Sequence, residues 1–261
     1  MTLDLIRYGV SMTIESISLL FLIGVVVGFI NIISAGGSLL SLPALIFFGI
    51  PSTMANGTNR VAIIIQNLSA MVEFYKKGMI NWRLSLLLAI PAVIGSLIGA
   101  QYAITLPEDI FNRILAIVMI TVLILMFTKP HQFIKSEKTA LTTKKIIALM
   151  IIFLVIGFYG GFIQAGVGFL IIATLTIFLH KMPLVEMHSV KTVVIAIYLI
   201  CSLIVFISHD QIHWGYALVL ALGGGVGGWA GSRFAIRIPE FWLKWTMIII
   251  ISLMAIGLFL R

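Results

Sequence analysis

Long apolar stretches separated by short polar intervals run along almost the whole chain, and they predict helices that cross a membrane. Stretches such as 17–33, 84–104 and 110–128 approach or reach the ~20 apolar residues that a helix needs to cross a hydrocarbon layer of ~30 Å. The pattern predicts about ten helical elements, roughly at 15–34, 37–49, 51–76, 82–104, 107–128, 144–165, 168–181, 183–208, 213–235 and 239–260.

The second half of the chain repeats the first. Trp82 and Pro107 recur as Trp214 and Pro239, each 132 residues later, and spaced glycines lie between them in both copies. The sequence therefore divides into a first transmembrane repeat at 1–128, a linker at 129–143 and a second repeat at 144–261. Duplicated hydrophobic chains with glycine-broken short segments in matching places are typical of membrane transporters.

Composition supports the same class. Hydrophobic residues make up 61% of the 261 residues and charged residues only 10%, whereas soluble proteins carry roughly 25% charged residues. The fold class predicted is an all-α polytopic membrane protein whose principal partner is the lipid bilayer. The single cysteine, Cys201, leaves no disulfide framework.

The positions of the charges predict how the chain crosses the membrane. The net charge is +8, but the basic residues lie in short loops between apolar spans, so nucleic acid is not the expected partner. Lysine and arginine favour cytoplasmic loops. With the linker at 129–143 cytoplasmic, most basic residues fall on that side if all five elements of each half cross. This arrangement makes the two five-element repeats inverted, with both termini outside and the chain in the cytoplasmic (inner) membrane.

The short elements near 37–49 and 168–181 leave an alternative open. If both were re-entrant, each half would cross four times and the loop with Arg233 and Arg237 would move outside. That arrangement weakens the charge bias, so ten elements are favoured. Elements of this length span only about 20 Å, so we expect half-helices or strongly tilted helices that begin inside the protein.

The two glycine-rich breaks that precede these half-helices are candidate binding sites. A helix that begins inside a membrane leaves N–H groups without intrahelical partners, and these suit an anion. The alternative is that the glycines only allow close helix packing. The candidate residues are Asn31, Ser34, Gly36, Gly37 and Ser38 in the first half, and Gln164, Gly166 and Gly168 in the second.

Polar residues follow Pro51 and Pro183, where the next long elements are expected to begin. At 1.5 Å per residue, Arg60 and Lys191 would lie about 12–14 Å inside the membrane. A charged group at that depth indicates a functional site, unless its long stem carries the charge to an interface. Because no carboxylate is expected at this depth, an anionic substrate is the predicted partner. The candidates here are Asn56, Thr58, Asn59 and Arg60, with His188, Ser189, Lys191 and Thr192.

Other chemistry finds little support. The chain carries no nucleophile elbow, metalloprotease or nucleotide-binding motif, so an enzyme, a cofactor and a metal site are not expected. Small residues four apart, such as Gly95 with Gly99 and Gly223 with Gly227, predict a strip along which two helices pack closely.

Three local patterns give the chain a resemblance to a known family. They are the glycine-rich break Ala35-Gly-Gly-Ser-Leu-Leu-Ser-Leu-Pro43, the run Ala55-Asn-Gly-Thr58 after Pro51, and the turn at 78–82, each with an altered counterpart in the second half. The chain resembles the TauE/SafE sulfite exporter family, also called the toluene sulfonate uptake permeases. The resemblance implies two inverted halves and transport of small sulfur-containing anions, such as sulfite or sulfonates.

The sequence as a whole predicts a secondary transporter of a small anionic substrate that works by alternating access. The expected anion is sulfite, a sulfonate or a related oxyanion or organic acid. The alternative is a channel-like or non-transporting membrane accessory protein. These patterns carry no information on the direction of transport or the coupling ion. A second copy of the chain, in a homo-oligomer, is a further candidate partner.

Overall fold

The computed structural model describes residues 13–34, 37–128, 142–179 and 182–234. Within these ranges the chain forms helices and no strands, and the predicted all-α membrane fold is confirmed. The helices are α2 (Ile14–Ser34), α3 (Ser38–Phe47), α4 (Ser52–Lys76), α5 (Trp82–Thr105), α6 (Glu108–Thr128), α7 (Thr143–Phe162), α8 (Val167–Phe178), α9 (Leu184–Ser208) and α10 (Trp214–Phe234). Most of the linker and the predicted element at 239–260 lie outside the described residues.

The predicted helix boundaries agree closely with the structure. Pro51 and Pro183 each occupy the N-cap, so α4 and α9 begin one residue later. The two short helices α3 and α8 contain 10 and 12 residues, which corresponds to about 15 and 18 Å. Neither is long enough to cross a bilayer alone, as the sequence predicted.

Four of the described helices, α2, α5, α7 and α9, are long and apolar enough to cross a membrane. The outer surface of the molecule is correspondingly apolar. Leu22, Ile90 and Ile204 expose about 59%, 60% and 64% of their surfaces. Exposed apolar side chains in this number form a surface suited to lipid rather than water. With the four apolar helices, they identify the chain as a multi-pass membrane protein.

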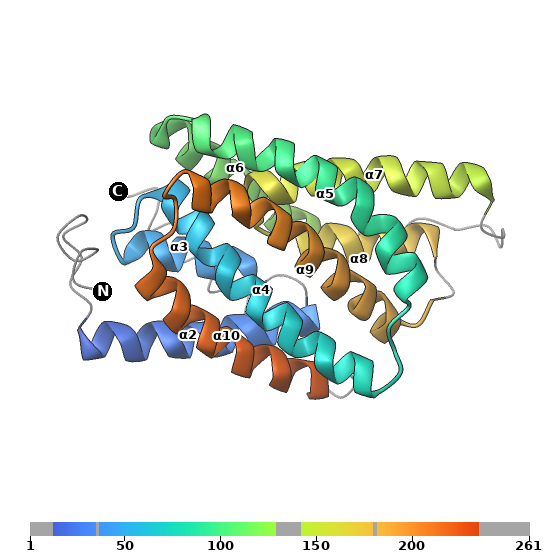
Figure 1. The fold of residues 1–261 in the computed structure, drawn as a ribbon, viewed down its shortest axis with the longest axis horizontal. Helices are drawn as coiled ribbons and strands as arrows, with labels where there is room; N and C mark the ends of the chain where they lie inside the picture. The colour runs from blue at the N-terminus through green and yellow to red at the C-terminus, as the bar shows by residue number, and fades with distance from the viewer. Residues whose placement is uncertain (1–12, 35–36, 129–141, 180–181, 235–261) are drawn as a thin grey trace.

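The two halves are inverted with respect to each other. In Figure 1, α2 runs from left to right and its counterpart α7 runs from right to left; α4 and its counterpart α9 are also antiparallel. The packing repeats with the same correspondence, because α10 lies against α2 and α4 as α5 lies against α7 and α9. An inverted repeat with a pseudo-two-fold axis is therefore visible in the helix packing.

The packing units are not the two halves of the sequence. Helices α2, α3, α4 and α10 pack together and form what we call the first bundle. Helices α5, α7, α8 and α9 form the second bundle. Each bundle thus contains three helices of one half and one helix of the other, and the two bundles meet mainly where α4 crosses α9.

Glycines bring the swapped helices into contact, as the spaced small residues predicted. In the second bundle, a Cβ atom at Gly95 would lie 2.0 Å from the Leu154 carbonyl oxygen. In the first bundle, a Cβ atom at Gly223 would lie 2.2 Å from the Phe21 carbonyl oxygen. Only glycine allows backbones to approach this closely, so α5 and α10 are fixed to helices of the opposite half.

One end of the molecule is basic and the other is acidic. Helices α4 and α10 end, and α5 and α7 begin, at the right of Figure 1, and these termini carry Lys76, Lys77, Arg233, Arg83, Lys144 and Lys145. The Glu73 carboxylate lies there, 3.6 Å from the Lys76 ammonium and 3.3 Å from Arg233 Nε. At the opposite end, α2 and α6 begin with Glu15, Glu108 and Asp109.

Candidate functional site

The two glycine breaks meet at the centre of the molecule, between the bundles. The backbone N–H of Gly166 donates a hydrogen bond to the Ser38 hydroxyl oxygen at 3.0 Å. Gly166 caps the start of α8, and Ser38 is the first residue of α3. An N–H group at a helix start has no intrahelical partner, so each half-helix begins against the other.

The second break is held in an unusual backbone conformation. Gln164 and Gly166 have φ angles of 67° and 72°, in the left-handed region that costs an L-residue roughly 1–2 kcal/mol. The Gln164 side chain accepts a hydrogen bond from the Tyr198 hydroxyl at 2.7 Å. The Tyr159 hydroxyl donates to the Ala165 carbonyl. Tyr198 from α9 and Tyr159 from α7 thus stabilise the conformation of the break.

Lys191 of the second bundle reaches the end of α2 in the first. Its ammonium donates to the carbonyl oxygens of Asn31 at 2.8 Å and Ile32 at 3.3 Å, and the residue is only 1% exposed. The last carbonyls of a helix lack intrahelical partners and carry its negative dipole end. The ammonium therefore compensates the broken end of α2.

Arg60 of the first bundle makes a comparable contact with the broken end of α7. Its guanidinium donates to the Gly161 carbonyl at the end of α7 and to the Ser202 hydroxyl at 2.9 Å. The guanidinium carbon also lies 4.3 Å from the centre of the Phe206 ring, a cation–π contact. The residue is fully buried.

One neighbouring polar side chain makes a similar contact. Asn56 Nδ2 donates to the Phe162 carbonyl oxygen at 2.7 Å. His188, its counterpart in the second half, is buried three residues before Lys191 on the same face of α9.

These contacts answer one question that the sequence left open. Neither cation extends its stem to an interface, because both are buried between the bundles. Backbone carbonyls accept hydrogen bonds from both cations. No carboxylate joins them: among the described residues, the salt bridges are those of Glu73 at the basic end.

Three predicted residues are placed elsewhere or turn inward on their own helix. The Thr58 hydroxyl oxygen accepts from the His213 N–H at 2.9 Å, just before α10. The Ser189 hydroxyl donates to the Met79 carbonyl at 2.7 Å, just before α5. The Thr192 hydroxyl donates to His188 O at 2.8 Å within α9. The first two therefore brace the connections into the swapped helices instead of facing the centre.

Of the remaining predicted residues, some lie near the centre and others lie outside the residues that the structure describes. Gly37 caps α3, and a Cβ atom there would lie 2.3 Å from the Val27 carbonyl oxygen. Gly168 is buried in the first turn of α8. Gly36 and the side chain of Ser34 lie outside the described residues.

Asn59 lies beside a narrow crevice in the first bundle. The crevice is too narrow to admit a water molecule; its lining includes Gly24, Val27, Ser41, Asn59, Gln66 and Gly224. Both amide atoms of Asn59 and the Nε2 atom of Gln66 are buried without a hydrogen-bond partner. Each such atom lowers the stability of the fold by about 1–3 kcal/mol.

Sequence reasoning missed four of the polar residues at this centre: Tyr198, Ser202, Gln66 and Ser41. A signal was present for three of them. Tyr198 and Ser202 follow Lys191 by 7 and 11 residues, and Gln66 follows Asn59 by 7. These spacings place the side chains on the same helix face. Extending each polar face by two to three turns would have found them.

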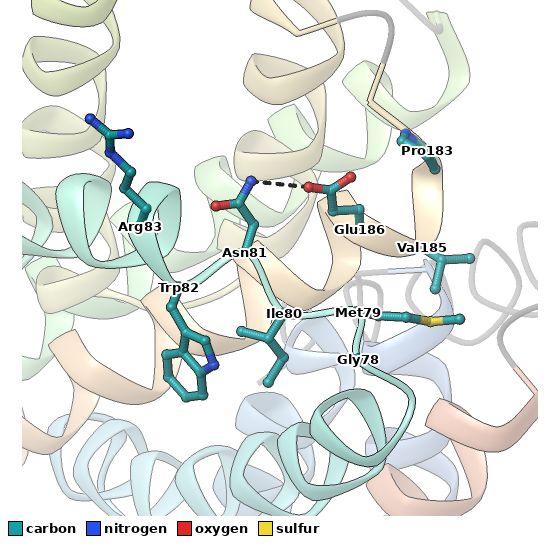
Figure 2. A pocket seen from close by; sticks show the side chains of 9 residues that line it. All are labelled: Gly78, Met79, Ile80, Asn81, Trp82, Arg83, Pro183, Val185 and Glu186. Atoms are coloured by element: carbon teal, nitrogen blue, oxygen red, sulfur yellow. Dashed lines mark hydrogen bonds between the residues drawn. The ribbon is translucent and has the colours of Figure 1, made fainter.

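An open depression of about 710 Å³ lies at the basic end, around the turn between α4 and α5. Figure 2 shows its lining, with Asn81 Nδ2 donating to Glu186 Oε1 at 3.1 Å and Arg83 pointing away from that pair. A carboxylate at the rim disfavours an anion there. Within the part of the chain that the structure describes, no cluster of three or more His, Cys, Asp or Glu residues is placed to hold a metal ion.

Comparisons with known proteins point to one family. The family model described as "Sulfite exporter TauE/SafE" matches residues 20–258. A "Probable membrane transporter protein" of Haemophilus influenzae is 27% identical over 242 residues, covering 92% of this chain and 93% of that protein. A "Probable membrane transporter protein ORF9" of a Sinorhizobium species is 25% identical, covering 93% and 92%. "Probable membrane transporter protein YfcA" of Escherichia coli is 25% identical, covering 90% and 86%. No solved structure matched the chain.

Proposed function

Because the chain belongs to the sulfite exporter TauE/SafE family, we propose that it is a secondary transporter of small sulfur-containing anions. Sulfite, a sulfonate or a related oxyanion or organic acid is the substrate class that the family name and the chemistry of the centre favour. Membrane transport itself is the common description of the relatives.

The observation that carries the proposal is the excess positive charge at the centre. Arg60 and Lys191 are buried at membrane depth, and no carboxylate bonds to either among the described residues. The two helix ends that they contact each supply about half a negative charge. About one positive charge is therefore left over, and a monovalent anion entering the centre would neutralise it. A charge at this depth is energetically costly, so its presence indicates a functional role.

The way in which the bundles meet supports alternating access. The contacts between them are polar and central: Ser38 with Gly166, Arg60 with Gly161, and Lys191 with Asn31. Many contacts within each bundle are glycine-mediated backbone contacts. The moving units are the first and second bundles, in place of the sequence halves, and they exchange central polar contacts as they rock.

The proposed location is the cytoplasmic membrane, with the basic end facing the cytoplasm. Helix termini at that end carry Lys76, Lys77, Arg83, Lys144 and Arg233, which fits the preference of lysine and arginine for cytoplasmic loops. Both chain termini would then lie outside.

Flux measurements in proteoliposomes that contain only this chain test the proposal. We expect saturable uptake of radiolabelled sulfite, and its loss in Arg60→Met and Lys191→Met at unchanged protein abundance. Lys144→Met is the matched control, because it removes an exposed cation at the start of α7, and it should transport as the unmodified chain does.

The same experiment separates the alternatives. Flux that rises in strict proportion to concentration would indicate a channel. An absence of flux with sulfite, thiosulfate, sulfoacetate, taurine and lactate would leave the accessory role. Normal sulfite flux in both cation variants would remove Arg60 and Lys191 from the proposed mechanism.

A further inference from the structure

The two bundles are related by pseudo-symmetry, but their interiors are not alike. The crevice beside Asn59 lies among α2, α3, α4 and α10, all in the first bundle. The equivalent place in the second bundle, among α7, α8, α9 and α5, is part of a continuous apolar core cluster. Glycine and amide side chains thus contribute to the lining of this place in the first bundle, and apolar side chains occupy it in the second.

Residue-by-residue correspondence shows why the copies differ. The repeat offset of 132 pairs Gly224 with Ala92 and Gln66 with Tyr198. The offset of 130 at the glycine breaks pairs Ser41 with Ile171. A Cβ atom at Gly28 would contact the Gly224 carbonyl oxygen, and a Cβ atom at Gly157 would contact the Ala92 carbonyl oxygen. Because Gly224 and Ala92 are equivalent, Gly28 and Gly157 are equivalent too, and the same offset pairs Gly24 with Phe153. At each pair the second bundle has the larger side chain, and all four of those residues are fully buried.

The polar groups differ in the same direction. In the second bundle, the Tyr198 hydroxyl bonds to Gln164, and the Lys191 ammonium bonds to Asn31 and Ile32. Their counterparts in the first bundle are Gln66 and Asn59. Both are 1% exposed, and Gln66 Nε2 and both Asn59 amide atoms have no hydrogen-bond partner. Buried polar atoms in native proteins are normally satisfied, and those that are not point to an absent ligand or to strain.

The unpartnered groups suit an oxyanion. Two side-chain amides supply N–H donors, and Ser41 lies in the first turn of α3, near the positive end of that helix. Val27, which lines the crevice, is one helical turn before Asn31, whose carbonyl holds the Lys191 ammonium. Neutral donors next to the crevice and a cation one turn away are a suitable combination for a small anion.

We propose that the substrate anion binds on one side of the pseudo-symmetry axis, in the first-bundle crevice, with Asn59 and Gln66 as its amide donors. This inference rests on the proposed function and assigns it a place. Binding of the anion requires this narrow crevice to widen. The second-bundle copy is filled by its own side chains and binds no substrate.

Two variants test the assignment in proteoliposomes with sulfite as the probe. In Gly224→Ala, the added Cβ would lie 3.5 Å from the Ala62 carbonyl oxygen and 3.6 Å from Gln66 Cβ, which are ordinary contacts. The fold should tolerate this methyl group, but the crevice should lose space for the anion. We expect sulfite flux to fall by at least about tenfold, the lower limit for a single methylene in a pocket. The control is Gly225→Ala, whose Cβ would meet only the Ile65 side chain, at 3.3 Å.

The second variant is Gln66→Leu, which removes the unpartnered donor. Because this change replaces an unsatisfied buried group with an apolar one, we expect the melting temperature to stay equal or to rise while sulfite flux falls. A residue with a purely structural role would instead lower the melting temperature when replaced. This opposite movement of stability and flux distinguishes a ligand-binding role.

The outcomes separate the two proposals. If the unmodified chain transports sulfite and either Gly224→Ala or Gln66→Leu transports it equally well, the crevice assignment is wrong and the proposed function stands. If Gly225→Ala loses as much flux as Gly224→Ala, the effect belongs to α10 in general and the assignment is also wrong. If the unmodified chain shows no saturable flux of sulfite, thiosulfate, sulfoacetate, taurine or lactate, both proposals fail.

Discussion

The Lys191 ammonium lies 2.8 Å from the carbonyl oxygen of Asn31, a residue 160 positions earlier in the chain. The contact joins the second bundle to the broken end of a helix in the first. Arg60 makes the reciprocal contact with Gly161. The two cations therefore act as partners for open helix ends and, in the proposed function, as the charge that attracts an anion.

The two roles of Lys191 are separable by substitution. Lys191→Gln keeps a side-chain donor for the helix end but removes the charge, whereas Lys191→Met removes both. Unsatisfied buried carbonyls cost about 1–3 kcal/mol each, so we expect Lys191→Met to unfold at a clearly lower temperature than Lys191→Gln. Both should lose sulfite flux.

Thermal unfolding in detergent and flux in proteoliposomes measure the two effects on the same preparations. Lys144→Met should change neither, because Lys144 is exposed. Retention of full flux by Lys191→Gln would show that hydrogen bonding alone suffices and that the charge is not required.

The glycine contacts predict a steric effect in the second bundle. A Cβ atom at Gly99 would lie 2.0 Å from the Phe158 carbonyl oxygen, so Gly99→Ala must separate α5 from α7. Overpacking of this kind costs typically 1–3 kcal/mol, and we expect a lower melting temperature. Gly225→Ala, with only a side-chain contact, should melt at the temperature of the unmodified chain or above. Equal melting temperatures for the two variants would contradict the close packing of α5 on α7.

Labelling of single cysteines tests the proposed orientation. In a Cys201→Ser background, cysteines replace Arg83 at the basic end and Thr105 at the other end of α5; both positions are exposed. An impermeant thiol reagent applied to intact cells should label the cysteine at position 105 only. In inverted vesicles it should label the cysteine at position 83 only. The reverse result would place the basic end outside.

Much of the fold could be predicted from the sequence because the membrane restricts the choices. Apolar length, the duplication at Trp82 and Trp214, and prolines at 51 and 183 set helix ends that the structure places within three residues of the expected positions. The half-helices were also predicted, since their apolar stretches are too short to cross. The family resemblance is confirmed over residues 20–258.

The swapped bundles were not predicted, because they depend on which glycine strip meets which helix. The sequence shows that Gly95 and Gly223 favour close packing, but it does not show that their partners belong to the opposite half. The same limit applies to Arg60 and Lys191. Their depth was readable from helix rise, whereas their carbonyl partners come from breaks more than 100 residues away.

Thr58 shows how a polar face can mislead. Thr58 lies two residues after Asn56 in the same run of polar residues, so the two side chains point about 200° apart around the helix. The Thr58 hydroxyl therefore accepts from the His213 N–H near the start of α10. Gln66 was missed for the opposite reason, because it lies two turns beyond the run, among apolar residues.

The most direct test of the central claim is whether the purified full chain binds the anion through its buried cations. A ligand that binds only the folded state stabilises it by about 2.7 kcal/mol at 100 times its Kd, so sulfite or sulfoacetate should raise the melting temperature of the unmodified chain. The account predicts that this rise disappears in Arg60→Met and Lys191→Met and persists in Lys144→Met. An equal rise in all four proteins, or none in the unmodified chain with any of the anions, would contradict it.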